Sequence, residues 1–304
     1  MTTPTCPPPT FRERLRSATV SAATWATTRL SGPMERVTHL AGRARVPVLM
    51  YHQVAESGAS FPWRIAPEVF AAQMQWLADQ GYTVLSLAEF VAAWSRGGLP
   101  GRAVVLTFDD GHVGVAKHAV PIMRRHGFPF SLFLATGSIG TPQFSWLAPQ
   151  LADTDPEEYR PFTWDEVRAL DPGLTTLGSH SVTHPHLGLL DAKRLEWELT
   201  TSRRTIAQET GQKVWALAYP GGIERYGDHS LDTRRALVAA GYACGLVSEI
   251  GCNGVDADPL RLRRLSIEAG DTVDTFRAKV VGAYGPVRTL QWAGQRLFDD
   301  PAGY

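Results

Sequence analysis

Short apolar runs alternate with longer stretches of helical periodicity along most of this 304-residue chain. Most of the runs are apolar nearly throughout, which is typical of strands that helices cover on both faces. The alternation predicts βα units around a parallel sheet, in one barrel-like α/β domain over residues 46–304. The predicted strands are Pro47–Tyr51, Val104–Phe108, Phe130–Ala135, Leu174–Gly178, Val214–Ala218, Ala243–Val247 and Leu262–Ile267.

Helix signals lie between these runs. Phe70, Met74 and Leu77 mark one face of a helix that ends at Gly81. Other segments carry capping boxes or a glycine at the helix end. These are Ser86 with Glu89, Thr163 with Glu166, and a long helix over Asp191–Thr210 that stops at Gly211.

Charge is balanced over the chain but uneven along it. Lys plus Arg and Asp plus Glu number 30 each, so no global charge favours nucleic acid as a partner. Residues 1–46 hold seven Arg and two Glu, a local charge of +5, which leaves 23 basic and 28 acidic residues, or −5, for the remainder. The basic excess therefore belongs to the segment that precedes the predicted domain.

Residues 1–45 are predicted to form a basic N-terminal arm. Apolar residues at spacings of three and four favour a short amphipathic helix that could contact an anionic membrane surface, and the alternative is a helix docked on the domain or a flexible arm. The stretch Ala18–Leu30 is interrupted by Thr, Ser and Arg and does not resemble a signal peptide. With only three cysteines and no disulfide framework, we expect a cytoplasmic protein or one peripheral to the membrane.

Two adjacent carboxylates follow one of the buried runs. Residues 104–111 read Val-Val-Leu-Thr-Phe-Asp-Asp-Gly, so Asp109 and Asp110 come at the carboxyl end of a strand, where parallel α/β folds bind ligands. The alternative is a solvated Asp-Gly turn.

Paired histidines follow another predicted strand. His180 and His184 are four residues apart, a spacing from which two imidazoles can bind one metal ion. Ser181 stands where a zinc-protease helix would have its glutamate, so that mechanism lacks its base. A carboxylate with two imidazoles from separate strand ends would make three ligands and leave room for water.

Two further segments end at the same predicted edge. His52 closes the first strand and is a candidate proton donor, because imidazole titrates near neutrality. Tyr219 and Gly221 lie in a Pro-Gly-Gly turn whose backbone N–H groups could donate to a developing oxyanion, although an ordinary turn is the alternative. Indole rings are candidate surfaces for a sugar but are more often part of a core, and they are Trp63, Trp146, Trp164 and Trp215.

Together these segments resemble the polysaccharide deacetylase family of metal-dependent carbohydrate esterases. Thr107-Phe108-Asp109-Asp110-Gly111 matches the first motif of the family, His180-Ser181-x-x-His184 the second, and Ala218-Tyr219-Pro220-x-Gly222 a bacterial form of the third. The resemblance covers residues 46–285 and implies a distorted seven-stranded (β/α) barrel. It further implies that Asp110, His180 and His184 hold the metal and that Asp109 is the base.

The chain departs from the family pattern in two places. No histidine follows His229, so the late histidine acid of many members is missing; the early Leu49-Met50-Tyr51-His52 instead resembles the permuted branch with bacterial poly-N-acetylglucosamine deacetylases, which implies that His52 is the acid. Gly221 replaces the aromatic residue of the third motif, and its arginine is absent too. Arg264 could orient Asp109 instead, although an exposed surface charge is the alternative.

The resemblance implies hydrolysis of an N-acetyl group on a saccharide, with Tyr219, Gly221 and Arg264 on the substrate side. One divalent ion is expected, zinc first because the ligands are imidazole and carboxylate, with cobalt, manganese, nickel or iron suited to the same set. Three alternatives remain: a non-catalytic carbohydrate-binding protein on this scaffold, a deformylase or deacetylase of a lipid- or nucleotide-linked sugar, and an iron oxygenase, which would leave Asp109 without a task.

Overall fold

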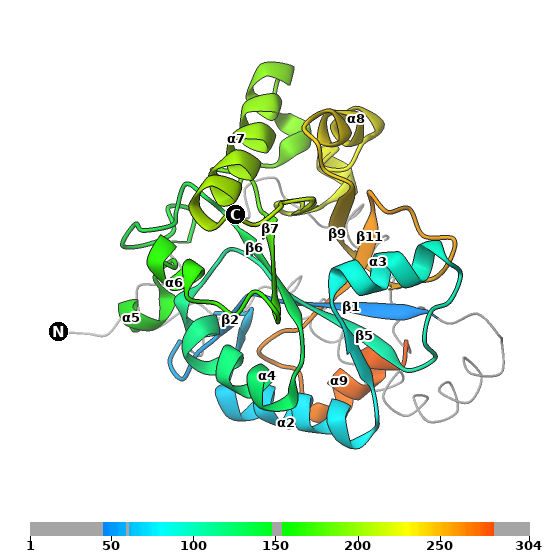
Figure 1. Ribbon diagram of the computed structural model, residues 1–304. Coiled ribbons are helices and arrows are strands. Elements are labelled where there is room, and N and C mark those ends of the chain that lie inside the picture. The colour runs from blue at the N-terminus through cyan, green and yellow to red at the C-terminus, as the bar shows by residue number, and fades with distance from the viewer. Residues whose placement is uncertain (1–44, 59–60, 148–153, 283–304) are drawn as a thin grey trace, which may run out of the picture.

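Seven strands form a closed parallel barrel in the computed structural model, which describes residues 45–58, 61–147 and 154–282 (Figure 1). The ring closes because β1 pairs with β5 on one side and with β11 on the other. A register shift between Leu262 and Arg264 interrupts the pairing of β11 with β9 and distorts the ring. In ring order the strands are β1 (Val46–Tyr51), β11 (Leu262–Ser266), β9 (Cys244–Ile250), β8 (Ala216–Ala218), β7 (Thr175–Ser179), β6 (Phe130–Leu134) and β5 (Ala103–Phe108).

Each of the seven predicted apolar runs supplies one barrel strand, so the predicted fold class is confirmed. The structure adds four short strands that the sequence pattern did not predict. They are β4 (Thr83–Leu85) beside β5, β10 (Cys252–Asn253) antiparallel to β1, and the small parallel pair of β2 (Gln53–Val54) with β3 (Arg64–Ile65). Segments of two or three residues are too short to show a period of their own.

Helices surround the barrel, and the capping signals of three of them lie where the sequence predicted them. Ser86 and Thr163 each form a complete capping box with the glutamate three residues on. The longest helix has Asp191 as its N-cap and Gly211 in the left-handed conformation after its last turn. The helices are α2 (Pro67–Asp79), α3 (Leu87–Ser95), the π-helical turn η1 (Val115–Ala119), α4 (Val120–His126), α5 (Pro156–Tyr159), α6 (Trp164–Arg168), η3 (Leu187–Leu189), α7 (Ala192–Thr210), η4 (Glu224–Tyr226), α8 (Leu231–Ala239) and α9 (Val273–Val280).

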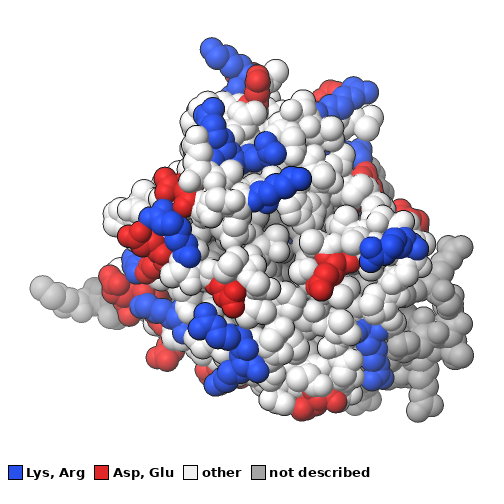
Figure 2. All heavy atoms as spheres, in the orientation of Figure 1, with Lys and Arg blue, Asp and Glu red and all other residues white. Residues whose placement is uncertain are grey.

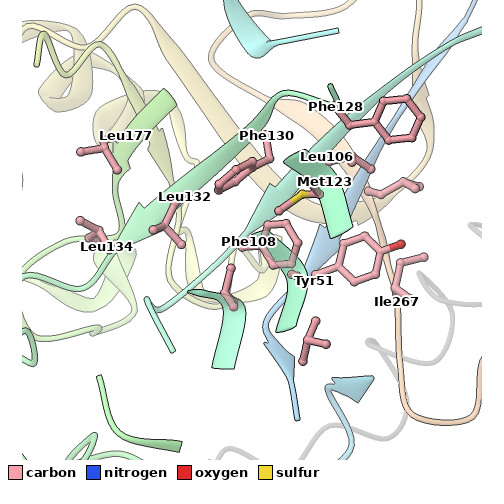
Figure 3. Packing of buried hydrophobic residues seen from close by; sticks show 14 of the residues in the cluster. Tyr51, Leu106, Phe108, Met123, Phe128, Phe130, Leu132, Leu134, Leu177 and Ile267 are labelled. Carbon is pink, nitrogen blue, oxygen red and sulfur yellow. The ribbon is translucent and has the colours of Figure 1, made fainter. Parts of the chain in front are cut away.

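Alternate residues of each strand pack on opposite sides of the barrel wall. On β5, Leu106 and Phe108 belong to the large cluster between the strands and the outer helices, which includes side chains of α2 and α4 (Figure 3). Val105 belongs to a second cluster, which gathers residues of β1, β6, β8, β9 and β11 inside the ring. Because strand side chains alternate, Thr107 and Asp109 continue the inward direction of Val105 toward the carboxyl end.

Helix α3 closes the opposite end of the barrel. Its Leu87 and Phe90 pack in the inner cluster with Val46 and Ala103, the first residues of β1 and β5. Figure 2 shows one face of the molecule, on which basic and acidic side chains are interspersed around a centre with few charges. Within the described residues, no helix combines the length and apolar content needed to cross a membrane.

The predicted N-terminal arm lies outside the described residues except for Arg45, which is exposed. The thiols of Cys244 and Cys252 are free.

Candidate metal centre

Four loops meet at the carboxyl end of the barrel. They follow β1, β5, β7 and β8, and they carry every candidate site residue that the sequence placed there except Arg264, which lies within β11. Backbone hydrogen bonds tie two of these loops to neighbouring strands, since the amide of Asp109 donates to the carbonyl of Tyr51 in β1 at 3.0 Å and the amide of His180 donates to that of Leu134 in β6 at 2.8 Å. The structure therefore brings together segments that lie far apart in the sequence.

Asp110, His180 and His184 form a compact group of potential metal ligands. Their ligand atoms all lie within 4.8 Å of one another, and Nε2 of each imidazole is 3.5 Å from Oδ1 of Asp110. That carboxylate oxygen is buried and has no hydrogen-bond partner. An unpaired buried oxygen that faces two ring nitrogens fits a divalent cation, which would satisfy all three atoms.

The ring of His180 is held in the orientation that a metal ligand needs. Its Nδ1 lies 2.8 Å from the carbonyl oxygen of Ala218, in β8. An N–H at that position donates to the carbonyl and leaves the lone pair of Nε2 facing Asp110. The neighbouring strand therefore fixes the tautomer of one ligand.

Strained backbone carries two of the three ligands. Asp110 and His184 have φ of 69° and 59°, and Ser181, between the two histidines, has φ of 64°. Residues other than glycine adopt this left-handed region only where the surroundings impose it, and such residues cluster at functional sites. After β5, the positive φ of Asp110 turns the chain so that its carboxylate and that of Asp109 enter different surroundings.

Buried aromatic rings line the outer side of this group. The ring of Trp146 stacks on His184, with centroids 4.4 Å apart and an angle of 10° between the planes. His112 is fully buried against Phe144, and its Nε2 lies 3.4 Å from Oδ2 of Asp110, the oxygen that does not face the two histidines. Sequence reasoning gave His112 no role, although its place two residues after Asp110 in the same turn was a usable signal.

These surroundings set the charges of the ligands. Burial, and then the nearby charge of His180, lowers the pKa of His184 to about 3, so its imidazole stays neutral and free to ligate. Burial opposes the ionisation of Asp110, but the hydrogen bond from His112 and the neighbouring imidazoles outweigh it and hold the pKa of Asp110 far below its usual value. The group thus offers the ionised carboxylate of Asp110 and the neutral imidazole of His184.

Asp109 lies against a permanent cation instead. Both terminal nitrogens of the Arg264 guanidinium lie 2.7 Å from its two carboxylate oxygens, and Arg264 is only 1% exposed. Burial raises the pKa of Asp109, but the charge and hydrogen bonds of Arg264 outweigh it, so the carboxylate stays ionised. Arg264 is therefore not an exposed surface charge, the alternative given above. Its buried guanidinium is paired with Asp109, so it lies behind the carboxylate and not on the substrate side.

His52 lies at the end of β1 within electrostatic range of both carboxylates. Its Nδ1 is buried without a hydrogen-bond partner, and its ring lies 5.5 Å from that of Trp63. Burial lowers the pKa of His52, and the charges of Asp110 and Asp109 oppose that shift. The imidazole is positioned near the two carboxylates, and its predicted task as the acid stays a prediction.

At the third motif, the ring of His186 from another loop lies beside Gly221, where the family has an aromatic residue. A Cβ at Gly221, whose φ is 66°, would lie 2.4 Å from Cε1 of His186. His186 is itself bound to the buried carboxylate of Asp228 at 2.8 Å, and its ring packs on Tyr226 at 4.3 Å. Glycine thus makes room for the ring of His186, which lies two residues after the second motif.

Other predicted substrate contacts lie deeper than expected. Tyr219 is fully buried and its hydroxyl donates to the carbonyl of Leu260 at 2.9 Å, so its side chain is unavailable to a substrate. Trp164 and Trp215 pack against the two core clusters. Only Trp63 and Trp146 lie beside site residues, on His52 and His184 respectively.

Comparisons with known proteins find similarity to polysaccharide deacetylases. Residues 96–245 match the model of the polysaccharide deacetylase family. The Bacillus subtilis protein YxkH, named for that family, is 26% identical over 238 residues, which cover 78% of this chain and 76% of the relative. A poly-beta-1,6-N-acetyl-D-glucosamine N-deacetylase of Staphylococcus epidermidis is 26% identical over 217 residues, 70% of this chain and 71% of the relative.

Solved structures share the fold. A Streptococcus pyogenes deacetylase, PplD, solved in complex with acetate, superposes with a TM-score of 0.65 at 23% identity, over 78% of this chain and 99% of that one. IcaB from Ammonifex degensii superposes with a TM-score of 0.61 at 20% identity, over 79% and 98%. At this identity the likeness establishes the distorted barrel.

Proposed function

Since residues 96–245 belong to the polysaccharide deacetylase family, we propose that this chain is a metal-dependent hydrolase that removes N-acetyl groups from an amino-sugar-containing saccharide. One observation carries the proposal. A carboxylate fixed by a buried arginine, Asp109, directly precedes the carboxylate that lies with His180 and His184 in a group suited to a divalent ion. An ion-binding site with a separate, ionised base beside it is the arrangement that amide hydrolysis by water requires.

The chemistry that the ion supplies when bound is polarisation of the amide carbonyl and a lowered pKa for water. Asp109 accepts the proton of the attacking water, as its ionised state allows. A backbone N–H at Gly221 donates to the oxyanion that develops on the carbonyl. His52 gives its proton to the departing nitrogen as the C–N bond breaks, and the products are acetate and a free amine on the sugar.

Zinc is the proposed native metal, because two imidazoles and one carboxylate with an open position suit catalytic zinc. Cobalt, manganese, nickel or iron would suit the same imidazole and carboxylate donors. Polymers of N-acetylglucosamine are the first substrate class to test, since a relative similar over 70% of this chain is named for one. Trp63 and Trp146 are half-buried and offer apolar surfaces on which a sugar ring can stack.

Acetate release tests the proposal directly. The protein is stripped with a chelator and assayed on β-1,6- and β-1,4-linked N-acetylglucosamine oligosaccharides, before and after one equivalent of Zn²⁺ is added. We expect no release from the stripped protein and recovery of release on adding zinc. Oligosaccharide binding without release would instead favour the carbohydrate-binding alternative, and release of formate or action on a nucleotide sugar alone would favour a deformylase or deacetylase of a lipid- or nucleotide-linked sugar.

A further inference from the structure

A buried glutamate on α7 contacts the loop that connects His180 to His184. Glu198 is fully buried. Its Oε2 accepts the backbone N–H groups of Val182 and Thr183 at 2.8 and 3.0 Å, and its Oε1 accepts the hydroxyl of Thr183 at 2.5 Å. We propose that Glu198 is a positioning residue that fixes the two imidazoles for metal binding, an inference that rests on the proposed metal-dependent function.

The loop needs such a partner because its backbone is strained. Ser181 and His184, on either side of the two anchored amides, both have positive φ. A left-handed conformation at residues with side chains persists only where several contacts impose it together. Glu198 supplies three of these contacts at the two residues between the strained positions.

A carboxylate suits this task better than a neutral acceptor. Hydrogen bonds from N–H and O–H groups to a charged oxygen are about twice as strong as those between neutral groups. The buried charge is compensated by Arg194, one turn earlier on α7, whose guanidinium donates to Oε1 at 2.8 Å and to the hydroxyl of Thr183 at 3.2 Å. Glu198 therefore has a bond for both of its oxygens and a nearby cation, which is how a buried carboxylate is tolerated.

Other contacts hold the start of the loop and one carbonyl at its middle. Ser179, the last residue of β7, bonds to Ser202 of α7 at 2.7 Å and accepts the amide of Ser181 at 3.2 Å. The carbonyl of Val182 accepts the amide of Gly137 at 2.8 Å. The amides of Val182 and Thr183 donate to Glu198, so its loss removes the acceptor of both central amides.

The test measures zinc affinity without turnover, by competition with a chromophoric chelator. Glu198→Gln keeps the shape and removes the charge. We expect its Kd for Zn²⁺ to rise on the order of 10–100-fold, the range seen when partners of metal ligands are lost, and the visible absorption of the Co²⁺-loaded protein to change. Glu196→Gln, an exposed glutamate two residues earlier on the same helix, serves as the matched control and should stay within about twofold of wild type.

A purely structural role would lower the melting temperature of the metal-free protein and leave the zinc affinity of the folded fraction intact. That result, a Kd within twofold of wild type for Glu198→Gln, overturns the inference. If Glu198→Gln does not fold, Thr183→Val decides, since it removes one bond to Glu198 at an exposed position; a rise of about threefold or more supports the inference and an unchanged Kd overturns it. If wild type itself fails to bind zinc, the proposed function falls with it, so the two failures are distinguishable.

Discussion

The site has two halves, and two consecutive carboxylates divide it. In the metal half, Asp110 faces the imidazoles of His180 and His184, which carry no permanent charge. In the acid–base half, Asp109 is paired with the permanent charge of Arg264 through one hydrogen bond and one ion-pair contact, each of 2.7 Å. The difference shows how one dipeptide can supply a ligand and a base, because each carboxylate is ionised for a different reason.

Each half also has its own supporting glutamate outside the site. Glu198 holds the loop between the two imidazoles. Glu158, on α5, accepts the amides of Glu56 and Ser57 and so holds the segment that follows His52. Both are buried carboxylates that bind backbone N–H groups of a loop. Each half is therefore supported by a buried glutamate that accepts loop amides, although the chemistry of the two halves differs.

Replacing Asp109 and Asp110 by asparagine, one at a time, should have the largest effects and tests the division of the site into two halves. We expect Asp109→Asn to lose on the order of 10²–10⁴ in acetate release, the usual contribution of a proton-transfer group, while zinc affinity stays near wild type. Asp110→Asn should lose both acetate release and zinc affinity. Its loss of zinc affinity should exceed the ~10–100-fold that follows when a residue supporting a metal ligand is removed. Acetate assays and chelator competition on both variants measure this, and equal zinc affinities in the two would abolish the division into halves.

Removing the guanidinium tests whether the acid–base half depends on its buried ion pair. Arg264→Met leaves the Asp109 carboxylate buried and unpaired, and we expect the free energy of unfolding to fall by about 3–5 kcal/mol. The double variant with Asp109→Asn removes the uncompensated charge and should recover part of that loss. Urea denaturation of the single and double variants gives the coupling, and additive losses would mean that the pair is not energetically linked.

Much of this architecture could be predicted from the sequence because its signals are local. Strands buried on both faces give unbroken apolar runs, and a parallel barrel brings the ends of those runs to one edge, so Asp110, His180 and His184 could be placed together. The partner of Asp109 is 155 residues away. Nothing local to Arg264 separates a buried arginine from an exposed one, which is why its burial came only from the fold.

The third motif shows the same limit. The sequence revealed that Gly221 lacks the usual aromatic side chain, but not that His186 fills the space above it. That contact needs the loop after β7 to cross the loop after β8, and Asp228, seven residues beyond Gly221, binds the amides of both Gly188 and Ile223. Replacement of one ring by another from a different loop leaves no periodic trace in a single sequence.

A side chain at Gly221 should destabilise the fold. Gly221→Ala places a Cβ 2.4 Å from the His186 ring at a φ of 66°, and we expect a loss of about 2–4 kcal/mol from the left-handed backbone and the overpacking together. His186→Ala in the same chain should relieve the contact and leave only the backbone part. Chemical denaturation of the two single variants and the double variant measures this, and a double variant no more stable than Gly221→Ala would show that the contact costs nothing.

The smallest effect should come from the support of the acid–base half, and it should depend on pH. Burial raises the pKa of Glu158, but the hydroxyl of Ser57 and the amides of Glu56 and Ser57 outweigh it and lower the pKa to about 2. A carboxyl group whose pKa is lower in the folded than in the unfolded chain stabilises the fold at high pH, in full above about 4.5, and loses that effect as the pH falls toward 2. Glu158→Gln should therefore cost about 1–2 kcal/mol at pH 7 and progressively less between pH 4.5 and 3.

Urea denaturation at pH 7, 4.5 and 3 measures this difference between wild type and Glu158→Gln. The neighbouring Glu157→Gln is the control, because that side chain is largely exposed and its change should stay within about 0.5 kcal/mol at every pH. A difference for Glu158→Gln that is constant across the pH range would mean that its charge does not hold the segment after His52. The two halves would then differ in their supports as well as in their chemistry, since the metal half alone would rest on a charged glutamate.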